Sequence, residues 1–527
     1  MRLLKISVVL TLSALCVAYP HPQGQQQHPF VPGQHLDNIA DNNGYARFDD
    51  EQVLRLQVAS MEELKQLEAT VEDMNLDLWS NLRIGTVDVR VSASMLDAFK
   101  EAVPLPSTVM IPNVQALVPE QAPAFNSLNA EPKGWNFTDD SFWLNYHDLA
   151  TLNNFTETMV QQFPHLVRRT SIGLTHEGRE VFGMTIHGYK NEDDKDDPDE
   201  DDDEDDDDED EEDDEDKEED VDLEELLNEV REELVEEAHS WWSWLIGSSK
   251  TDKKPHALSK KPSKPKKHPK AIVIHGGQHA REWIGPATVS YIAKELILGY
   301  RTNNKITRVV DQFEFVIVPV LNVDGYTYTW ERNRMWRKNR QPTSIPFCTG
   351  IDTNRNWGYM WNKGGSSGNP CSDAYHGPEP FAAKEPKMVA DFILKKENVV
   401  AYIDFHAYSQ LWMTPFGWDC SKIPKDDEDI MEAGLGAAKA LRDVHGTKFA
   451  VGSVCNIIYQ ASGGSLDWTY AEGNVKYSYA VELRDTGKHG FMLPEEEILP
   501  SGQETFAGFL HLANFIRKRE KQWGYMV

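Results

Sequence analysis

Five short apolar segments between residues 181 and 483 most restrict the folds open to this chain. They read VFGMTIHG (181–188), AIVIHGG (271–277), FEFVIVPVLN (313–322), AYIDFHAY (401–408) and YSYAVEL (477–483). Segments with helical periodicity alternate with them, at residues 287–300, 386–396 and 430–444. This alternation is typical of an α/β protein with helices on both faces of its sheet. We therefore expect a mixed, mostly parallel sheet, with functional residues at the carboxyl ends of its strands.

A separate small α+β unit, an open sandwich, is predicted for residues 45–118. A strand-like segment precedes a helix-like one in which Ser60 is a candidate N-cap, and a second pair of the same kind follows. Such a unit is able to fold independently. Residues 119–141, with several prolines and Lys133 as their only basic residue, are expected to link it to the large domain, residues 142–527.

The N-terminus has the pattern of a secretory signal peptide, residues 1–18. Arg2 and Lys5 precede an apolar run from Ile6 to Val17, which is too short to span a bilayer comfortably. A buried first helix is the alternative. Residues 19–44, rich in Pro, Gln and His, are expected to form a flexible leader. No later segment has the ~20 consecutive apolar residues of a membrane span, so we expect a protein that is secreted or delivered to a vacuole or lysosome, without a membrane partner.

Secretion determines the chemistry of the cysteines. An even number of cysteines in an oxidising compartment predicts disulfides, and four cysteines allow three pairings. The four that follow the signal peptide are Cys348, Cys371, Cys420 and Cys455. Asn136 and Asn154 each begin an Asn-Phe-Thr triplet and are candidate glycosylation sites.

An insertion of biased composition, residues 190–270, separates the first two apolar strands of the large domain. Twenty-six residues from Asn191 to Asp220 are acidic, and their mutual repulsion favours an extended, solvated segment. Leucines at helical spacing, a tryptophan cluster and nine lysines between Lys250 and Lys270 follow. The acidic block would compete with nucleic acid for these lysines, so we expect no nucleic-acid binding. Self-pairing in solvent, a partner or matrix contact through the tryptophans, and weak calcium binding are the alternatives.

His279 and Glu282 are three residues apart, directly after the strand that ends in His275. Residues at i and i+3 lie on one side of a turn, and catalytic zinc usually has three protein ligands and one open position. His406 ends another apolar strand and is a candidate third ligand, although a buried histidine can also be structural.

Glu482 ends the last apolar strand and could act as a base beside a metal. An ion pair with Arg484 is its structural alternative. Two arginine-rich segments, 332–340 and 352–358, could clamp a carboxylate or stabilise an oxyanion. On composition alone, such segments are more often solvated surface.

The motifs HAREWI, NRMWRK, DTNRNW, DFHAYSQ, YQASGGSLDW and ELRDTGKHGF occur in the order, and at roughly the intervals, of zinc metallocarboxypeptidases of the carboxypeptidase A/B type. The chain resembles these secreted zymogens from about Phe142 to its C-terminus, apart from the insertion, and residues 45–118 resemble their inhibitory prodomain. The resemblance implies a monomer with one zinc ion (Zn2+), bound by His279, Glu282 and His406. Its substrates would be peptide or protein C-termini, and a protease would activate it by cutting the linker, at Lys133 if it is trypsin-like and otherwise elsewhere between Val118 and Phe142.

The resemblance also assigns roles to single residues. Glu482 would be the general base that takes a proton from the attacking water, and Arg337 would stabilise the oxyanion. Four further residues match groups that contact substrate in similar enzymes: Arg281, Asn354, Arg355 and Tyr459. The same alignment implies two disulfides, Cys348–Cys371 and Cys420–Cys455.

Leu466 occupies the position that distinguishes the specificities of similar enzymes. An aliphatic residue there accompanies a preference for apolar terminal residues, and an aspartate accompanies a preference for Lys or Arg. A leucine favours an apolar guest, so we expect bulky aliphatic or aromatic termini to be preferred. Asp404, two residues before His406, is either ion-paired or admits basic residues.

TWERNRMWRKNRQ and FCTGID also resemble a fungal branch of the family whose members are regarded as inactive. That branch departs at the base and in the carboxylate clamp, whereas this chain keeps Glu482, Asn354 and Arg355. We therefore expect an active peptidase. A zinc-binding but inactive protein that acts through its acidic insertion is the alternative, and an acidic binding module on a peptidase scaffold is a third.

Overall fold

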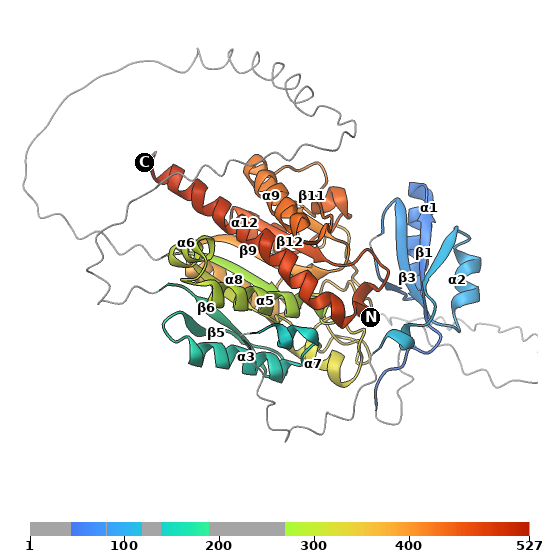
Figure 1. Ribbon diagram of the computed structural model, residues 1–527. Helices are drawn as coiled ribbons and strands as arrows, with labels where there is room; N and C mark the ends of the chain where they lie inside the picture. The colour runs from blue at the N-terminus through green and yellow to red at the C-terminus, as the bar shows by residue number, and fades with distance from the viewer. Residues whose placement is uncertain (1–43, 81, 119–136, 138, 189–268, 526–527) are drawn as a thin grey trace, which may run out of the picture. The chain divides into compact units, whose positions relative to one another are not determined.

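The computed structural model describes residues 44–80, 82–118, 137, 139–188 and 269–525 (Figure 1). The signal peptide, nearly all of the leader, Lys133, Asn136 and most of the insertion lie outside these ranges, so the expectations for them stay predictions. Within the described ranges, no helix is long and apolar enough to cross a membrane.

The small domain is an α+β unit, as the sequence predicts. Its four antiparallel strands are arranged in the order β2-β3-β1-β4. Their bounds are β1 Gln52–Val58, β2 Asp77–Leu78, β3 Gly85–Val91 and β4 Ser107–Ile111, with helices α1 Met61–Asp73 and α2 Leu96–Ala102 and the 3₁₀ turn η2 Val114–Leu117. The side chain of Ser60 caps α1 by accepting a hydrogen bond from the backbone N–H of Glu63. Leu54, Leu67 and Phe99 help to form a core of its own.

The large domain contains a mixed eight-stranded sheet. The strand order is β11-β10-β12-β9-β7-β8-β6-β5. The strands are β5 Val167–Leu174, β6 Glu180–Ile186, β7 Lys270–Gly276, β8 Phe313–Val318, β9 Val399–Ala407, β10 Leu411–Thr414, β11 Ala450–Ser453 and β12 Tyr477–Leu483. The four central strands, β12, β9, β7 and β8, run parallel, and β6 and β10 are antiparallel to them.

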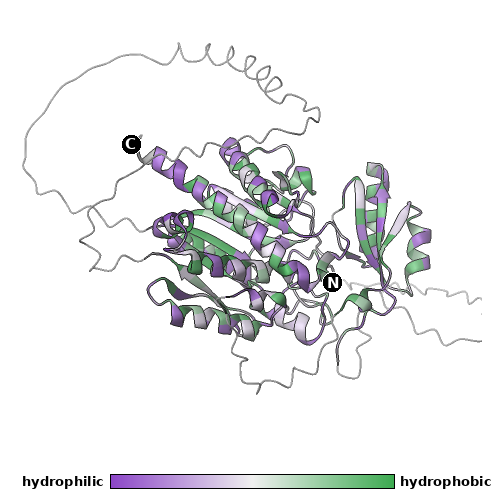
Figure 2. Ribbon diagram, viewed as in Figure 1, coloured by the Kyte–Doolittle hydropathy of each residue, from purple (hydrophilic) through white to green (hydrophobic). Residues whose placement is uncertain are grey.

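Helices flank this sheet. They are α3 Leu149–Gln162, α5 Ile284–Gly299, α6 Asn304–Gln312, α7 Val323–Glu331, α8 Lys384–Lys396, α9 Asp427–His445, α10 Val454–Ile457, α11 Ser465–Ala471 and α12 Ile498–Tyr525, with 3₁₀ turns η4 Asp140–Leu144, η7 Thr353–Arg355, η8 Gly490–Met492 and η9 Glu495–Glu497. The long helix α12 packs against α5, α6 and α9. Figure 2 shows hydrophobic residues along the central strands and alternating hydrophilic and hydrophobic residues along α12.

Burial on both faces explains the apolar runs of the central strands. Every residue of β7 after Lys270 is buried, and β9 is buried from Ala401 onward. Strands that helices cover on both sides have no solvent face that would require polar residues. The polar residues of β9, Asp404 and His406, are therefore exceptions that need a specific partner.

The structure contains the two disulfides that the resemblance implies. Cys348 is bonded to Cys371, and Cys420 to Cys455. Asn154, the candidate glycosylation site among the described residues, lies half-buried on α3.

Candidate metal centre and substrate cleft

The turn between β7 and α5 brings His279 and Glu282 to the carboxyl end of the sheet. The chain leaves β7 at Gly276 and turns at Gly277, whose φ is +62°. A Cβ atom on Gly276 would lie 2.7 Å from the carbonyl carbon of Gly285 at the start of α5. Only glycine permits this close approach of helix to strand, which fixes where the turn holds its side chains.

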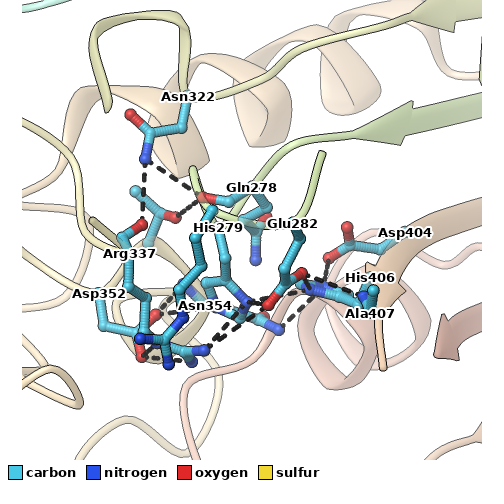
Figure 3. A network of polar contacts seen from close by, with 12 residues as sticks. Gln278, His279, Glu282, Asn322, Arg337, Asp352, Asn354, Asp404, His406 and Ala407 are labelled. Carbon is cyan, nitrogen blue, oxygen red and sulfur yellow. Dashed lines mark hydrogen bonds and ion pairs between the residues drawn. The ribbon is translucent and has the colours of Figure 1, made fainter. Parts of the chain in front are cut away.

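Three side chains converge there. His279 Nδ1 lies 2.8 Å from Glu282 Oε1, and His406 Nδ1, from the end of β9, lies 2.9 Å from Glu282 Oε2 (Figure 3). The two Nδ1 atoms are 3.1 Å apart, and all three residues are buried. Among the described residues, this is the one group of metal-capable side chains close enough to share an ion.

The outer contacts of both histidines fit a zinc ion. His279 Nε2 lies 3.2 Å from Asp352 Oδ1, and His406 Nε2 lies 2.9 Å from Asp404 Oδ2. A carboxylate that accepts the Nε2 proton leaves the Nδ1 lone pair for the metal, an arrangement typical of zinc-bound histidines. Two imidazole nitrogens and a carboxylate, with room for a further ligand in the cleft, match the ligands of catalytic zinc.

Glu482 lies beside this cluster. In the ladder between β12 and β9 it is paired with His406, and it lines the cleft. Its Oε2 atom is buried and has no hydrogen-bond partner among the described residues. Burial, followed by the nearby carboxylate of Glu282, raises the pKa of Glu482 to about 8. A positive charge at the ligand cluster acts in the opposite direction, because it favours the carboxylate.

Arg337 reaches the same cluster from the loop after α7. Its Nη1 lies 3.2 Å from His279 Nδ1, and its Nε and Nη2 donate to Asp352 Oδ2 at 3.2 and 2.9 Å. Burial opposes the charge of Arg337, but Asp352 and Glu282 outweigh it and hold the pKa of the guanidinium above its usual value. Arg337 is therefore a fixed cation beside the ligands.

Asn354 and Arg355 lie on the turn η7, which Asp352 caps by accepting the backbone N–H of Asn354 at 2.9 Å. Arg355 Nη2 donates to the hydroxyl of Tyr459. Asn354 Oδ1 accepts the backbone N–H of Ser465 at 2.9 Å. Asn354, Arg355 and Tyr459 all line the cleft, so the structure brings the expected carboxylate clamp together at one place.

Leu466 lies at the start of α11 in an apolar cluster with Met413, Ile458 and Ala480. These side chains line part of a cleft of about 830 Å³. The carboxylate of the neighbouring Asp467 accepts backbone N–H groups of the loop after β10.

Asp404 is not part of the cleft lining. Its side chain is fully buried and contacts His406, Ser465 and His275. Of the two possibilities left open by the sequence, the structure has the paired carboxylate.

Arg281 contacts the small domain. Its Nη1 donates to both carboxylate oxygens of Asp77, at 2.8 and 2.9 Å, and its guanidinium carbon lies 4.1 Å from the ring centroid of Phe491. Leu78 and Trp79 of the small domain also line the cleft. In this form of the chain, Arg281 is therefore occupied by a carboxylate of the small domain.

Sequence reasoning missed the residues that hold the site residues in place. Asp352 binds both His279 and Arg337, and Ser465 binds both Asp404 and Asn354. Asp352 lies inside the DTNRNW motif, and its position as a cap of the turn was the available signal. Ser465 lies inside the YQASGGSLDW motif, but its contacts carried no signal, because both partners are more than sixty residues distant in sequence.

A sheet with this order, a buried His-Glu-His cluster and an adjacent glutamate define a zinc carboxypeptidase, here preceded by an activation domain. The family model described as zinc carboxypeptidase matches residues 152–508, and the chain belongs to that family. The model described as carboxypeptidase activation peptide matches residues 54–121.

Relatives of two kinds are similar to this chain. Inactive metallocarboxypeptidase ECM14 of Ajellomyces dermatitidis is 30% identical over 528 residues, which cover 94% of this chain and 76% of that protein. Carboxypeptidase A2 of Mus musculus is 33% identical over 478 residues, 89% of this chain and 94% of that protein. Carboxypeptidase B of Astacus astacus is 48% identical over 248 residues, 47% of this chain and 80% of that protein.

Solved structures show the same fold. The crystal structure of thrombin activatable fibrinolysis inhibitor has a TM-score of 0.67 at 27% identity and covers 89% of this chain and 100% of that one. Carboxypeptidase A of Helicoverpa armigera has a TM-score of 0.66 at 20% identity, over 89% and 98% of the two chains.

Proposed function

We propose that this chain is a secreted zinc exopeptidase, made as a zymogen, that removes bulky aliphatic or aromatic residues from the C-termini of peptides. The observation that carries the proposal is the position of Glu482. It lines the same cleft as the three candidate zinc ligands and the carboxylate clamp. Its buried Oε2 atom has no hydrogen-bond partner among the described residues, so it is available to accept a proton.

The zinc ion, held by His279, Glu282 and His406, would supply a Lewis acid and lower the pKa of water. Glu482 takes the proton of the attacking water and passes it to the leaving amine. Arg337, held by Asp352, donates to the oxygen that becomes negative when the carbonyl is attacked. Because Asp352 fixes this guanidinium beforehand, little reorganisation accompanies the reaction.

The clamp accounts for attack at the chain end. Arg355 and Asn354 present N–H donors to the cleft, and a guanidinium binds a carboxylate through two parallel hydrogen bonds. Tyr459 is the third member of this group and touches Arg355. An internal peptide bond has no terminal carboxylate to satisfy these donors, so the clamp selects exopeptidase cleavage.

The proposed preference for apolar termini rests on Leu466 and its neighbours. Met413, Ile458 and Ala480 pack with it in one apolar cluster. Burial of a large apolar terminal side chain against this cluster contributes roughly 1.5–3 kcal/mol to the free energy of substrate binding. A lysine or arginine would place its charge among these apolar side chains.

The competing function is that of a zinc-binding protein without peptidase activity. The similarity to inactive metallocarboxypeptidase ECM14 over 94% of this chain favours it. Against it stands the retention of Glu482, Asn354 and Arg355 in one cleft.

The test uses protein activated by a trypsin-like protease and a blocked dipeptide ending in Phe or Leu. We expect hydrolysis that a zinc chelator abolishes and that added zinc restores. Glu482→Gln should lower kcat by a factor on the order of 10² to 10⁴, whereas Glu379→Gln, at an exposed position, should leave it unchanged. Undiminished hydrolysis by Glu482→Gln would refute the mechanism. Zinc-loaded native protein without any hydrolysis would favour the inactive alternative.

A further inference from the structure

Asp404 is a buried carboxylate to which the proposed reaction assigns no task. It lies on β9, two residues before His406, so both side chains project from the same face of the strand. Its exposed fraction is 0%, and it does not line the cleft. A buried carboxylate is costly unless hydrogen bonds or charges compensate it. Its partners therefore indicate its purpose.

The two oxygens of Asp404 have different partners. Oδ2 lies 2.9 Å from His406 Nε2 and accepts the hydroxyl of Ser465 at 2.6 Å. Oδ1 lies 3.3 Å from His275 Nδ1, while the other nitrogen of that ring contacts the hydroxyl of Tyr402. Figure 3 shows Asp404 and Glu282 both reaching the side chain of His406.

These contacts determine the tautomer of His406. An ionised carboxylate only accepts hydrogen bonds, so the Nε2 atom of His406 must carry the proton. The Nδ1 atom, 2.9 Å from Glu282 Oε2, then keeps its lone pair for a metal. Asn354 Nδ2 lies 3.3 Å from the same Nε2, and as a donor it cannot replace Asp404 in this role.

Ser465 connects this carboxylate to the carboxylate clamp. Its hydroxyl binds Asp404, and its backbone N–H donates to Asn354 Oδ1. Ser465 is also the first residue of α11 and directly precedes Leu466. A single serine thus joins the metal ligand, the clamp and the apolar pocket.

We propose that Asp404 is a positioning residue of the metal centre, which fixes the ring orientation and tautomer of His406 and, through Ser465, its place relative to the clamp. This inference rests on the zinc site of the proposed function. If Asp404 has this role, its removal should increase the rate of zinc release by more than a loss of packing alone would.

The experiment measures zinc release from the full chain into a chromogenic chelator, for native protein and Asp404→Asn. The variant keeps the shape of the side chain but loses its charge. We expect release to be about 10 to 100 times faster. Glu385→Gln, which removes another fully buried carboxylate far from the ligands in sequence, should release zinc at the native rate. Cobalt-substituted Asp404→Asn should have a shifted visible absorption spectrum.

The metal-free proteins separate positioning from packing. We expect Asp404→Asn to lower the Tm of the zinc-loaded protein more than that of the metal-free protein. After activation, it should lower kcat with little change in KM. Equal zinc release by native and variant protein, or an unchanged cobalt spectrum, would overturn the inference. If Asp404→Asn does not fold, Asp404→Ser replaces it with the same expected and opposing outcomes. Native protein that binds no zinc would instead overturn the proposed function.

Discussion

At the scale of single residues, spacing alone does not identify a metal site. His376 and Glu379 have the same spacing as His279 and Glu282. His376 Nδ1, however, contacts the carbonyl oxygen of Gly377, and Glu379 is exposed. The difference is the distant His406, which only folding brings within 3.1 Å of His279.

Leu466 allows the specificity to be tested by one substitution. Leu466→Asp would place a carboxylate among Met413, Ile458 and Ala480. We expect kcat/KM for a blocked dipeptide ending in Phe to fall about 100-fold, because an apolar guest leaves that charge uncompensated. Activity toward a terminal Arg should rise relative to Phe.

The control for this substitution is Leu435→Asp, at an exposed position on α9, which should leave both substrates unaffected. Equal loss on Phe and Arg substrates after Leu466→Asp would mean that the pocket had collapsed, and unchanged hydrolysis of Phe would contradict the assigned pocket.

At the scale of elements, the sequence located long periodic segments and missed others. The strands β7, β8, β9 and β12 and the helices α5, α8 and α9 follow from apolar runs and helical spacing. Strands β10 and β11 have four residues each, too few for a period to emerge. Helix α12 begins with ILPSG, which reads as a turn. Proline is nevertheless tolerated in the first turn, where the backbone N–H has no helical partner.

Helix α8 contains a test of buried charge. Glu385, in its first turn, is fully buried, and burial raises its pKa to about 7. The folded protein therefore binds a proton that the unfolded chain releases above about pH 4.5, so stability falls as the pH rises from about 4.5 to 7.

Glu385→Gln removes this dependence. The Tm of the variant minus that of the native protein should increase as the pH rises from 5 to 7.5. The corresponding change in the free energy of unfolding is up to about 3 kcal/mol. Thermal scans at several pH values measure the difference. Glu428→Gln, at an exposed first-turn position of α9, should give a constant difference. A constant difference for Glu385→Gln as well would show that the carboxyl is ionised in the folded state.

At the scale of the whole molecule, the sheet brings the two ends of the insertion close together. Ile186 of β6 and Ile272 of β7 both pair with Phe315, one on each side of β8. Two strand spacings, roughly 10 Å, therefore separate the ends that the insertion joins. They lie at the edge where β7 begins, whereas His279 follows its other end.

We expect a chain with residues 191–268 replaced by a short Gly/Ser linker to fold and, after activation, to hydrolyse the blocked dipeptide at the native rate. Circular dichroism and kcat/KM measure the two properties. A folded deletion variant without hydrolysis would support a function that works through the insertion.

The small domain offers a second test at this scale, through Asp77. Its carboxylate binds Arg281 and also accepts from Arg90 at 3.0 Å. Truncating one partner of a buried ion pair costs roughly 2–5 kcal/mol. We expect Asp77→Asn to raise the residual hydrolysis of the uncleaved chain. After the small domain is removed, native and variant enzymes should be identical.

Asp97→Asn, at an exposed position on α2, is the matched control and should leave the uncleaved chain as inactive as native protein. No increase for Asp77→Asn would mean that this ion pair does not contribute to inhibition.

The sequence by itself determined the class of fold, the disulfide pairing through its family resemblance, and the candidate catalytic residues. Apolar runs and the order of motifs can be read along the chain without knowledge of its contacts. Only the tertiary structure decided which residues contact them. Asp352 contacts His279, Asp404 contacts His406, and Ser465 contacts both Asp404 and Asn354. These contacts join segments far apart in sequence, and a carboxylate acquires its partner only when the strands and turns that carry both have packed together.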